Sequence, residues 1–543
     1  MHLGHLFEPV GEKNPIPQDT HFMLVILTDR KIRYLSICLN EVIYNSAKNT
    51  NQNMMINSEN THPLKKKTRA LCFFVAEKSE PFGLPKLDSK LLAAIKQSVK
   101  ETKGKRGSIY IVHTHGLIPA EKIVLAGLGE RHKITHETLR TSSGKLAKKI
   151  KELEIGEFSI VLPDSFPLKA DFAINAIVEG VNLSQYSFDK YKKEKNSNFP
   201  NLTVLVSDKT KILHHIIKAK TVSDGVNFAR SIANLPPNEC APVHLAGFAK
   251  SLASKNKLKC IILSKNELRQ KGFGGITAVG QGSKNEPKLI ILEYNGKKED
   301  RPTVLVGKAV TFDTGGISIK PAEKMDEMKF DKCGGCTVLG IMKAVSELKL
   351  PVNIIGIIPS VENMPGGESY RPGDIIKLYG GSTAEILNTD AEGRLILSDA
   401  LSYGVKTYKP KAILDFATLT GACIVALGAN VAGLVSNNNN LVNKIKRSSD
   451  KTGEEIWHLP LNDDYMDMIK SDYADIKNVG TGRAAGAITA AAFLANAVGD
   501  VPWAHFDIAG TAWVQAGAKE KSYNPKGATG FGVRLVIDYL SSL

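Results

Sequence analysis

Two segments of the sequence bring carboxylates and a lysine together in apolar surroundings, where unpaired charges would be very costly. They are residues 306–331 and residues 388–395, and the second reads NTDAEGRL. Divalent metal ions are the natural counter-charge for such a cluster, and its oxygen ligands suit Zn²⁺, Mn²⁺ or Mg²⁺. The side chains concerned are Lys308, Asp313, Asp331, Asp390 and Glu392.

The predicted secondary structure places these residues at the edge of a sheet. Lys308 follows a continuous apolar run at residues 303–306, and in open α/β sheets the carboxyl ends of strands border the ligand crevice. The Gly-Gly pair at 315–316 predicts a loop whose backbone can approach a ligand closely. Asp390 and Glu392 precede a predicted helix, whose dipole favours negative charge there. Any one of these residues would more often cap a helix or face solvent, but their coincidence favours a metal site.

The elements that must position these residues are those of an α/β protein. Apolar runs alternate with helical periodicity from about residue 65 to 218, which predicts an α/β domain. Beyond 220 the apolar runs are continuous, which is typical of a sheet buried on both faces. We therefore predict a partly disordered N-terminal extension at 1–60, where asparagines are frequent from 45 to 60. An N-terminal α/β domain at 61–218 and a C-terminal domain at 219–543 follow.

Individual elements follow from the same patterns. Residues 221–233 are predicted to be a helix that ends before Pro236 and Pro237, since proline cannot continue a helix. The other predicted helices are 91–99, 139–150, 333–348, 393–406 and 484–498. The predicted strands are 71–75, 109–112, 122–125, 158–162, 202–206, 289–292, 303–306, 352–358 and 412–416.

The net charge of +16 is concentrated in the first part of the chain. Residues 1–220 hold 34 basic and 22 acidic side chains, whereas residues 221–543 hold 37 and 33. A basic surplus is compatible with DNA binding, although solvated lysine-rich faces are the more common explanation. No helix-turn-helix or zinc finger pattern accompanies it. An additional DNA-binding or regulatory role of the basic N-terminal half is therefore kept as the alternative.

Cysteine usage and hydropathy indicate the compartment. Seven scattered cysteines form no disulfide framework, which suits a reducing environment. Cys333 and Cys336 have C-x-x-C spacing without a second pair, so a tightly packed helix start is favoured over a redox or zinc site. The apolar run at 22–27 is too short to span a membrane and lacks the flanks of a signal peptide. We expect a cytoplasmic protein without membrane segments.

Residues 388–395 resemble the signature of the leucyl (cytosol) aminopeptidase family, and residues 308–331 resemble the other metal-site block of that family. Further matches are ANLPPN at 233–238, TLTG at 418–421 and WAHFDIAG at 503–510. The resemblance covers about residues 65 to 543. It implies a smaller N-terminal macro-like domain and a larger C-terminal α/β/α catalytic domain with a central mixed sheet.

The resemblance also implies a site and a mechanism. Two divalent ions, Mn²⁺ or Zn²⁺, would activate a bridging water that attacks the peptide bond, and one ion would bind the free α-amine of the substrate. Lysine as a ligand must be neutral, which burial and a dication can achieve. One ion would be held by Lys308, Asp313, Asp331 and Glu392, and the other by Asp313, Asp390 and Glu392.

The remaining roles implied by the resemblance concern catalysis, specificity and assembly. Lys320 would stabilise the gem-diolate, and Arg394 would hold a bicarbonate ion that acts as general base. An apolar pocket would favour N-terminal Leu-like residues of peptide substrates. The implied substrate-binding residues are Met328, Asn388, Thr418 and Leu419. Family members form homohexamers, each a dimer of trimers, and we expect the same assembly here.

Overall fold

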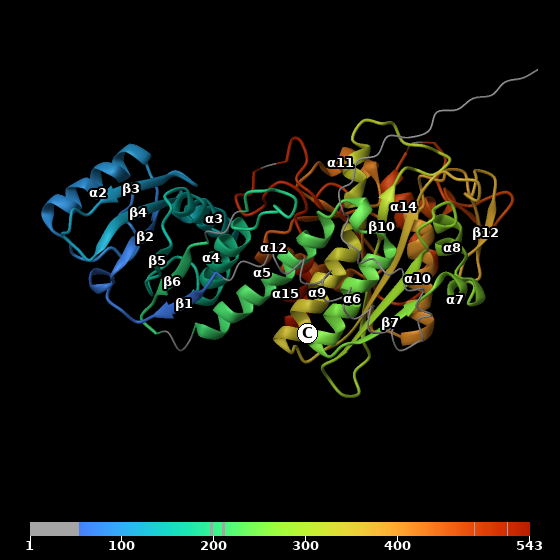
Figure 1. Ribbon diagram of the computed structural model, residues 1–543, viewed down its shortest axis with the longest axis horizontal. Coiled ribbons are helices and arrows are strands. Elements are labelled where there is room, and N and C mark those ends of the chain that lie inside the picture. The colour runs from blue at the N-terminus through green and yellow to red at the C-terminus, as the bar shows by residue number, and fades with distance from the viewer. Residues whose placement is uncertain (1–53, 196–198, 209–211, 483, 519) are drawn as a thin grey trace, which may run out of the picture.

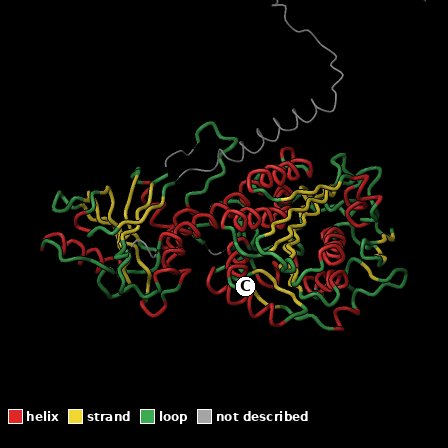
Figure 2. The backbone as a smooth tube through the Cα atoms, turned by 90° about the horizontal axis from the view of Figure 1, so that it is seen from below, coloured by secondary structure: helices red, strands yellow, loops and turns green. Residues whose placement is uncertain are grey.

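The computed structural model describes residues 54–195, 199–208, 212–482, 484–518 and 520–543. Within them the chain forms two α/β domains, each built around a sheet of its own, as predicted (Figure 1). The backbone trace shows the two groups of strands well separated, with helices between them (Figure 2). The predicted extension up to residue 53, including the apolar run at 22–27, lies outside the described residues.

The N-terminal domain contains a six-stranded sheet in the order β1-β6-β5-β2-β4-β3. All neighbours are parallel except β3 and β4. The sheet includes β1, whose residues the sequence prediction assigned to the extension. The strands are β1 (Ile56–Glu59), β2 (Thr68–Ala76), β3 (Ile109–His113), β4 (Ala120–Gly129), β5 (Glu157–Val161) and β6 (Asn201–Leu205), and the α-helices are α2 (Ser89–Thr102), α3 (His136–Glu152) and α4 (Ala170–Ser184).

The C-terminal domain is built on a larger mixed sheet in the order β16-β15-β18-β14-β9-β11-β8-β7, with β10 beside β11. Strands β18, β14, β9, β11 and β10 run parallel, whereas β15, β8 and β7 are antiparallel to their inner neighbours. Its strands are β7 (Lys259–Leu263), β8 (Lys288–Asn295), β9 (Thr303–Gly307), β10 (Ala309–Asp313), β11 (Asn353–Asn363), β14 (Ala412–Ala417), β15 (Ala432–Ser436), β16 (Ile456–His458) and β18 (Trp503–Asp507). A small separate sheet holds β12 (Ile375–Lys377), β13 (Thr383–Glu385) and β17 (Ile476–Lys477).

Helices cover both faces of the large sheet, so its central strands β9, β11, β14 and β18 are buried along their whole length, as the continuous runs predicted. On one face lie α5 (Leu213–Ala233), α6 (Pro242–Asn256), α9 (Cys333–Leu348), α12 (Asn439–Thr452) and α15 (Val533–Ser541). On the other lie α7 (Lys265–Gln270), α8 (Gly274–Gly280), α10 (Gly393–Tyr408) and α14 (Gly486–Val498). The short helices are α11 (Gly421–Leu427), α13 (Asp463–Asp467), η1 (Pro63–Lys65), η2 (Arg131–Lys133), η3 (Pro237–Glu239) and η4 (Met325–Lys332).

Helix α5 joins the two domains. It ends at Ala233 as predicted but begins at Leu213, earlier than the predicted residue 221. It packs against α4 of the N-terminal domain and α9 of the C-terminal domain, and both contacts are visible along its length in Figure 1. The predicted division between 218 and 219 therefore falls inside one continuous helix.

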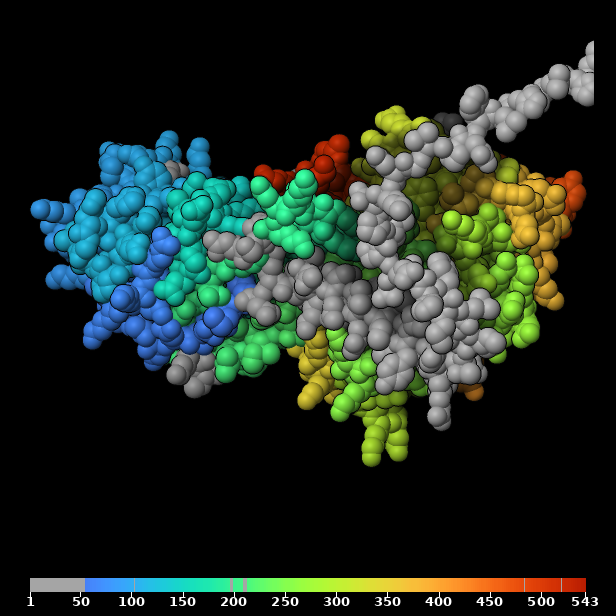
Figure 3. Space-filling view, viewed as in Figure 1, coloured from blue at the N-terminus to red at the C-terminus, as the bar shows by residue number. Residues whose placement is uncertain are grey.

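A buried ionic network also connects the domains. Glu179 of α4 pairs with Arg140 of α3 at 2.6 Å and with Arg534 of α15 at 3.3 Å. Arg140 pairs in addition with Glu137 at 2.6 Å. Burial opposes the charge of the two guanidiniums, but the neighbouring acidic groups outweigh it and raise the pKa of both. The space-filling view shows the N-terminal domain as the blue and cyan end of the molecule (Figure 3). Because Glu179 and Arg140 belong to that domain and Arg534 to the C-terminal one, the network joins the two domains.

The C-x-x-C pair lies at the start of α9, which confirms the prediction of a packed helix start. Both thiols are buried, and burial raises the pKa of Cys333 to about 12 and that of Cys336 well above its ordinary value. Because the thiolate is the reactive form, we expect neither cysteine to react with a thiol reagent in the native protein at pH 8. Peptide mapping after labelling should find both modified only after urea is added, and rapid native labelling would contradict the assignment.

None of the helices among the described residues combines the length and the apolar character needed to cross a membrane.

Candidate metal centre and active site

The parallel strands of the large sheet bring three of the predicted site residues to one edge. Lys308 directly follows β9, Asp313 ends β10 and Thr418 directly follows β14. Because these strands run in the same direction, their carboxyl ends meet at the same edge of the sheet. Segments more than 100 residues apart are joined here, since the Lys308 Nζ donates to the Thr418 carbonyl at 2.9 Å.

Two further segments complete the cluster. Asp331 comes from the 3₁₀ helix η4, and Asp390 and Glu392 come from the loop before α10. Carboxylate oxygens of Asp313, Asp390 and Glu392 all lie within 4.8 Å of one another, a spacing at which one cation could bind all three. The structure therefore assembles the five residues that the sequence analysis selected as ligands.

Lys308 pairs with Asp331 and Glu392, and these three residues form the first half of the cluster. Its Nζ is 2.9 Å from Asp331 Oδ1 and 2.8 Å from Glu392 Oε1. Burial alone would lower the pKa of Lys308, but Asp331, Glu392 and Asp313 outweigh it and raise that pKa. Gly393 leaves room for this lysine, because a Cβ there would lie only 2.7 Å from Lys308 Cε and would force the side chain to shift.

Lys320 occupies the second half of the cluster. Its Nζ is 2.9 Å from Asp313 Oδ2 and forms a short ion pair with Asp390 Oδ1. Burial opposes its charge, but Asp313, Glu392 and Asp390 raise its pKa above the ordinary value. Its side chain is 21% exposed, whereas that of Lys308 is 4% exposed, so Lys320 is the lysine that borders solvent.

The four carboxylates outnumber the two lysines, and all of them are buried except Asp390, whose side chain is 32% exposed. Burial raises the pKa of Asp331, and Glu392 and Asp313 add to that shift while Lys308 opposes it. Burial also raises the pKa of Asp390, with contributions from Asp313 and Glu392. Asp331 Oδ2 is buried and has no hydrogen-bond partner among the described residues, although Oδ1 accepts from Thr418 Oγ1 at 2.6 Å. An uncompensated carboxylate oxygen of this kind is what a cation site requires.

Arg394 lies in the first turn of α10 and is buried. Its Nη1 donates to the Asn478 carbonyl at 2.7 Å, while its Nε has no hydrogen-bond partner in the part of the chain that the structure describes. Burial lowers its pKa to about 10. A guanidinium held by one edge with a free donor at the other can receive an anion.

The four predicted substrate-binding residues lie on the segments that carry the cluster. Met328 is half-buried in η4, three positions before Asp331. Leu419 is half-buried beside Thr418, whose hydroxyl and carbonyl face Asp331 and Lys308. The Asn388 side chain forms a hydrogen bond within its own loop, where its Oδ1 accepts from the Asp390 N–H at 2.8 Å.

The sequence analysis did not select three buried residues that hold Asp313 or the loop that carries Asp390. Asn363 donates to Asp313 Oδ1, Tyr370 donates to the Thr389 carbonyl, and Asn478 donates to the Asn388 carbonyl. Asn363 could have been found by extending the predicted strand 352–358 to its true end, because that end meets the same crevice. No comparable signal marks Tyr370 or Asn478, which lie in segments without strong periodicity.

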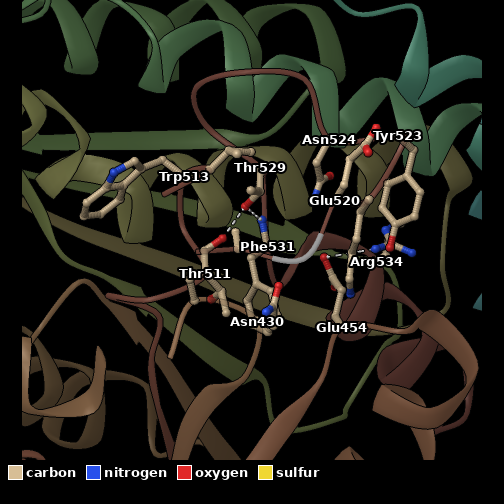
Figure 4. A pocket seen from close by; sticks show the side chains of 14 residues that line it. Asn430, Glu454, Thr511, Trp513, Glu520, Tyr523, Asn524, Thr529, Phe531 and Arg534 are labelled. Carbon is tan, nitrogen blue, oxygen red and sulfur yellow. Dashed lines mark hydrogen bonds and ion pairs between the residues drawn. The ribbon is translucent and has the colours of Figure 1, made fainter. Parts of the chain in front are cut away.

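A separate cavity of about 170 Å³ in the C-terminal domain does not belong to this site. Figure 4 shows Arg534 in its ion pair with Glu454 on one side of this cavity, close to Tyr523. None of its lining residues is a predicted site residue.

Comparison with known proteins decides the family. The sequence model described as "Cytosol aminopeptidase family, catalytic domain" matches residues 227–537, and the model of the N-terminal domain of the same family matches residues 70–195. The chain belongs to the cytosol aminopeptidase family. It is therefore an aminopeptidase, a hydrolase that acts on peptides.

Similar proteins align with this aminopeptidase over most of its length. A "Probable cytosol aminopeptidase" of Cenarchaeum symbiosum (strain A) is 58% identical over 491 residues, covering 90% of this chain and 99% of the relative. One of Roseiflexus castenholzii is 46% identical over 444 residues, covering 80% and 90%. The solved structure of the bottromycin maturation enzyme BotP in complex with Mn is 28% identical, with a TM-score of 0.78 and coverage of 88% and 99%.

The alternative of an additional DNA-binding role for this aminopeptidase has no support in these similarities, and it is not proposed. Solvated lysine-rich faces therefore remain the explanation of the basic surplus in residues 1–220.

Proposed function

We propose that this aminopeptidase is metal dependent and releases N-terminal residues, preferentially Leu-like ones, from peptides during intracellular peptide turnover. The observation that carries the proposal is the gathering of four carboxylates around two lysines at one sheet edge, where Asp331 Oδ2 has no hydrogen-bond partner within the described ranges. Two divalent ions would balance these carboxylates once Lys308 gives up its proton. The Mn-bound BotP structure supports Mn²⁺ as one of the ions, with Zn²⁺ as the other candidate.

The residues divide into two ligand sets. Asp313 and Glu392 would contribute to both ions. Glu392 pairs with Lys308 and Asp313 pairs with Lys320, yet carboxylate oxygens of the two lie within 4.8 Å of each other. Lys308 and Asp331 would complete one set, and Asp390 would complete the other. When bound, the ions would acidify a water molecule and polarise the scissile carbonyl.

Lys320 and Arg394 would act on the reacting groups. Lys320 reaches the cluster from its solvent-facing side, so its ammonium can stabilise negative charge that develops on the carbonyl oxygen. Arg394 would hold a bicarbonate ion as general base through its free Nε, because that donor is buried and has no partner in the described chain. Met328, Thr418 and Leu419 would surround the first side chain of the substrate, and Asn388 would shape the loop beneath it.

A metal-removal experiment tests the proposal. After treatment with a chelator, we expect hydrolysis of Leu-p-nitroanilide to fall to background, because the carboxylates alone provide no strong electrophile. Mn²⁺, Zn²⁺, Co²⁺ and Mg²⁺ are then added back separately, and Mn²⁺ or Zn²⁺ should restore activity. Full activity after verified metal removal, or no recovery with any metal, would contradict the metal-dependent mechanism.

We also propose a cytoplasmic homohexamer built as a dimer of trimers. Val425 and Trp457 are apolar side chains that are 90% and 63% exposed, which suits burial in an assembly. Light scattering that gave the mass of a monomer would contradict this assembly.

A further inference from the structure

Asn363 is a buried, uncharged residue that hydrogen-bonds to Asp313 of the cluster. It is the last residue of β11, is fully buried, and pairs in register with Asp313 at the end of β10. Its side-chain Nδ2 donates to Asp313 Oδ1 at 2.8 Å and to the Thr389 carbonyl at 3.1 Å. One amide therefore connects the strand end that carries Asp313 to the loop that carries Asp390.

The two carboxylate oxygens of Asp313 have different partners. Oδ1 accepts from the Gly315 N–H at 2.9 Å as well as from Asn363 Nδ2. Oδ2 accepts neither of these bonds and lies 2.9 Å from Lys320 Nζ. Two donors on one oxygen restrain rotation of the carboxylate and leave Oδ2 directed toward Lys320.

The orientation of the Asn363 amide follows from its neighbours. Asp313 Oδ1 and the Thr389 carbonyl are both acceptors, so exchanging the amide oxygen and nitrogen would place acceptor against acceptor at both contacts. In the orientation that satisfies them, Asn363 Oδ1 is buried, and no described residue donates a hydrogen bond to it. An apolar side chain would avoid the cost of that oxygen, so packing alone does not account for asparagine here.

The Thr389 carbonyl is held from a second side. Tyr370 donates its hydroxyl to the same carbonyl at 2.6 Å, and Thr389 Oγ1 donates to the Gly315 carbonyl at 2.6 Å. The backbone before Asp390 is thus bound both to the loop after β10 and to the amide of Asn363. A shift of Asn363 would move ligands of both proposed ions together.

We propose that Asn363 is a positioning residue that fixes Asp313 with Oδ2 toward the cations and holds the Asp390 loop in register with it. This role rests on the proposed metal-dependent function. Removing a hydrogen-bond partner of a metal ligand typically weakens metal binding about 10–100-fold. The expected effect is therefore on cation affinity more than on substrate binding.

Three variants test this role. Asn363→Ala removes the donor, and Asn363→Asp keeps the shape of the side chain but places a carboxylate against Asp313. Asn353→Ala is the matched control, because Asn353 lies at the other end of β11, is 8% exposed, and makes comparable bonds to Asp300 and Lys297. Mn²⁺ binding to each metal-free protein is measured by calorimetry, beside its melting temperature and its kinetics at saturating Mn²⁺.

We expect both Asn363 variants to bind Mn²⁺ about 10–100-fold more weakly than the wild type, with recovery of activity as Mn²⁺ is raised and little change in KM. Asn353→Ala should bind Mn²⁺ as the wild type does. If the wild type binds Mn²⁺ and either folded Asn363 variant binds it equally well or more tightly, the positioning role is wrong while the proposed function stands. If the wild type itself binds no Mn²⁺ or Zn²⁺, the proposed metal-dependent function fails.

Discussion

Replacing Lys320 by alanine is expected to lower kcat for Leu-p-nitroanilide by roughly 10²–10³-fold, the usual effect of removing a group that stabilises a developing oxyanion. The reason is its position, since its ammonium lies against Asp313 and Asp390 yet borders solvent where a substrate carbonyl can reach it. Cation binding should persist in Lys320→Ala, because the ammonium competes with a cation for the same oxygens. The measurement is steady-state kinetics combined with Mn²⁺ calorimetry.

Two further variants distinguish the loss of the Lys320 charge from a general disturbance of this segment. Lys320→Arg keeps the positive charge and should retain part of the activity lost by Lys320→Ala. Lys324→Ala changes an exposed lysine of the same segment and should behave as the wild type. Full turnover by Lys320→Ala would remove Lys320 from the mechanism, and equal losses in both alanine variants would indicate a disturbed segment instead of lost catalysis.

Replacing Glu179 by alanine is expected to reduce the free energy of unfolding by about 3–5 kcal/mol, the range observed when one partner of a buried ion pair is removed. Glu179 is the carboxylate that Arg140 and Arg534 share across the domain contact, at 2.6 and 3.3 Å. Both guanidiniums are at most 5% exposed, so each would be left as a buried charge that has lost a partner. Urea denaturation followed by fluorescence and circular dichroism measures the change.

The matched control for this prediction is an exposed glutamate of α3. Glu152 pairs with Lys149 at 3.0 Å, but its side chain is 63% exposed, so Glu152→Ala should change stability by less than about 0.5 kcal/mol. A Glu179→Ala protein that unfolds at the same urea concentration as the control would show that the network contributes no net stability to the domain contact.

The sequence by itself determined the local elements and the identity of the reactive residues. The apolar runs at 303–306 and 412–416 predicted β9 and β14, and the pattern at 393–406 predicted α10, because period and strand length are properties of adjacent residues. The run at 303–306 also predicted that Lys308 would follow a strand end. The NTDAEGRL segment identified the family, which the comparisons confirmed.

Only the tertiary structure decided which of these residues meet and how each is held. The parallel order β18-β14-β9-β11 brings Lys308 to the Thr418 carbonyl, and no local pattern encodes that order. Likewise, Asn363 and Asn478 are polar residues of ordinary appearance in the sequence, and they gain a role only where the folded chain places acceptors against their amides. The domain contact through α5 and Glu179 was invisible for the same reason, since its partners are distant in sequence and the energy of a buried ion pair depends on its three-dimensional surroundings.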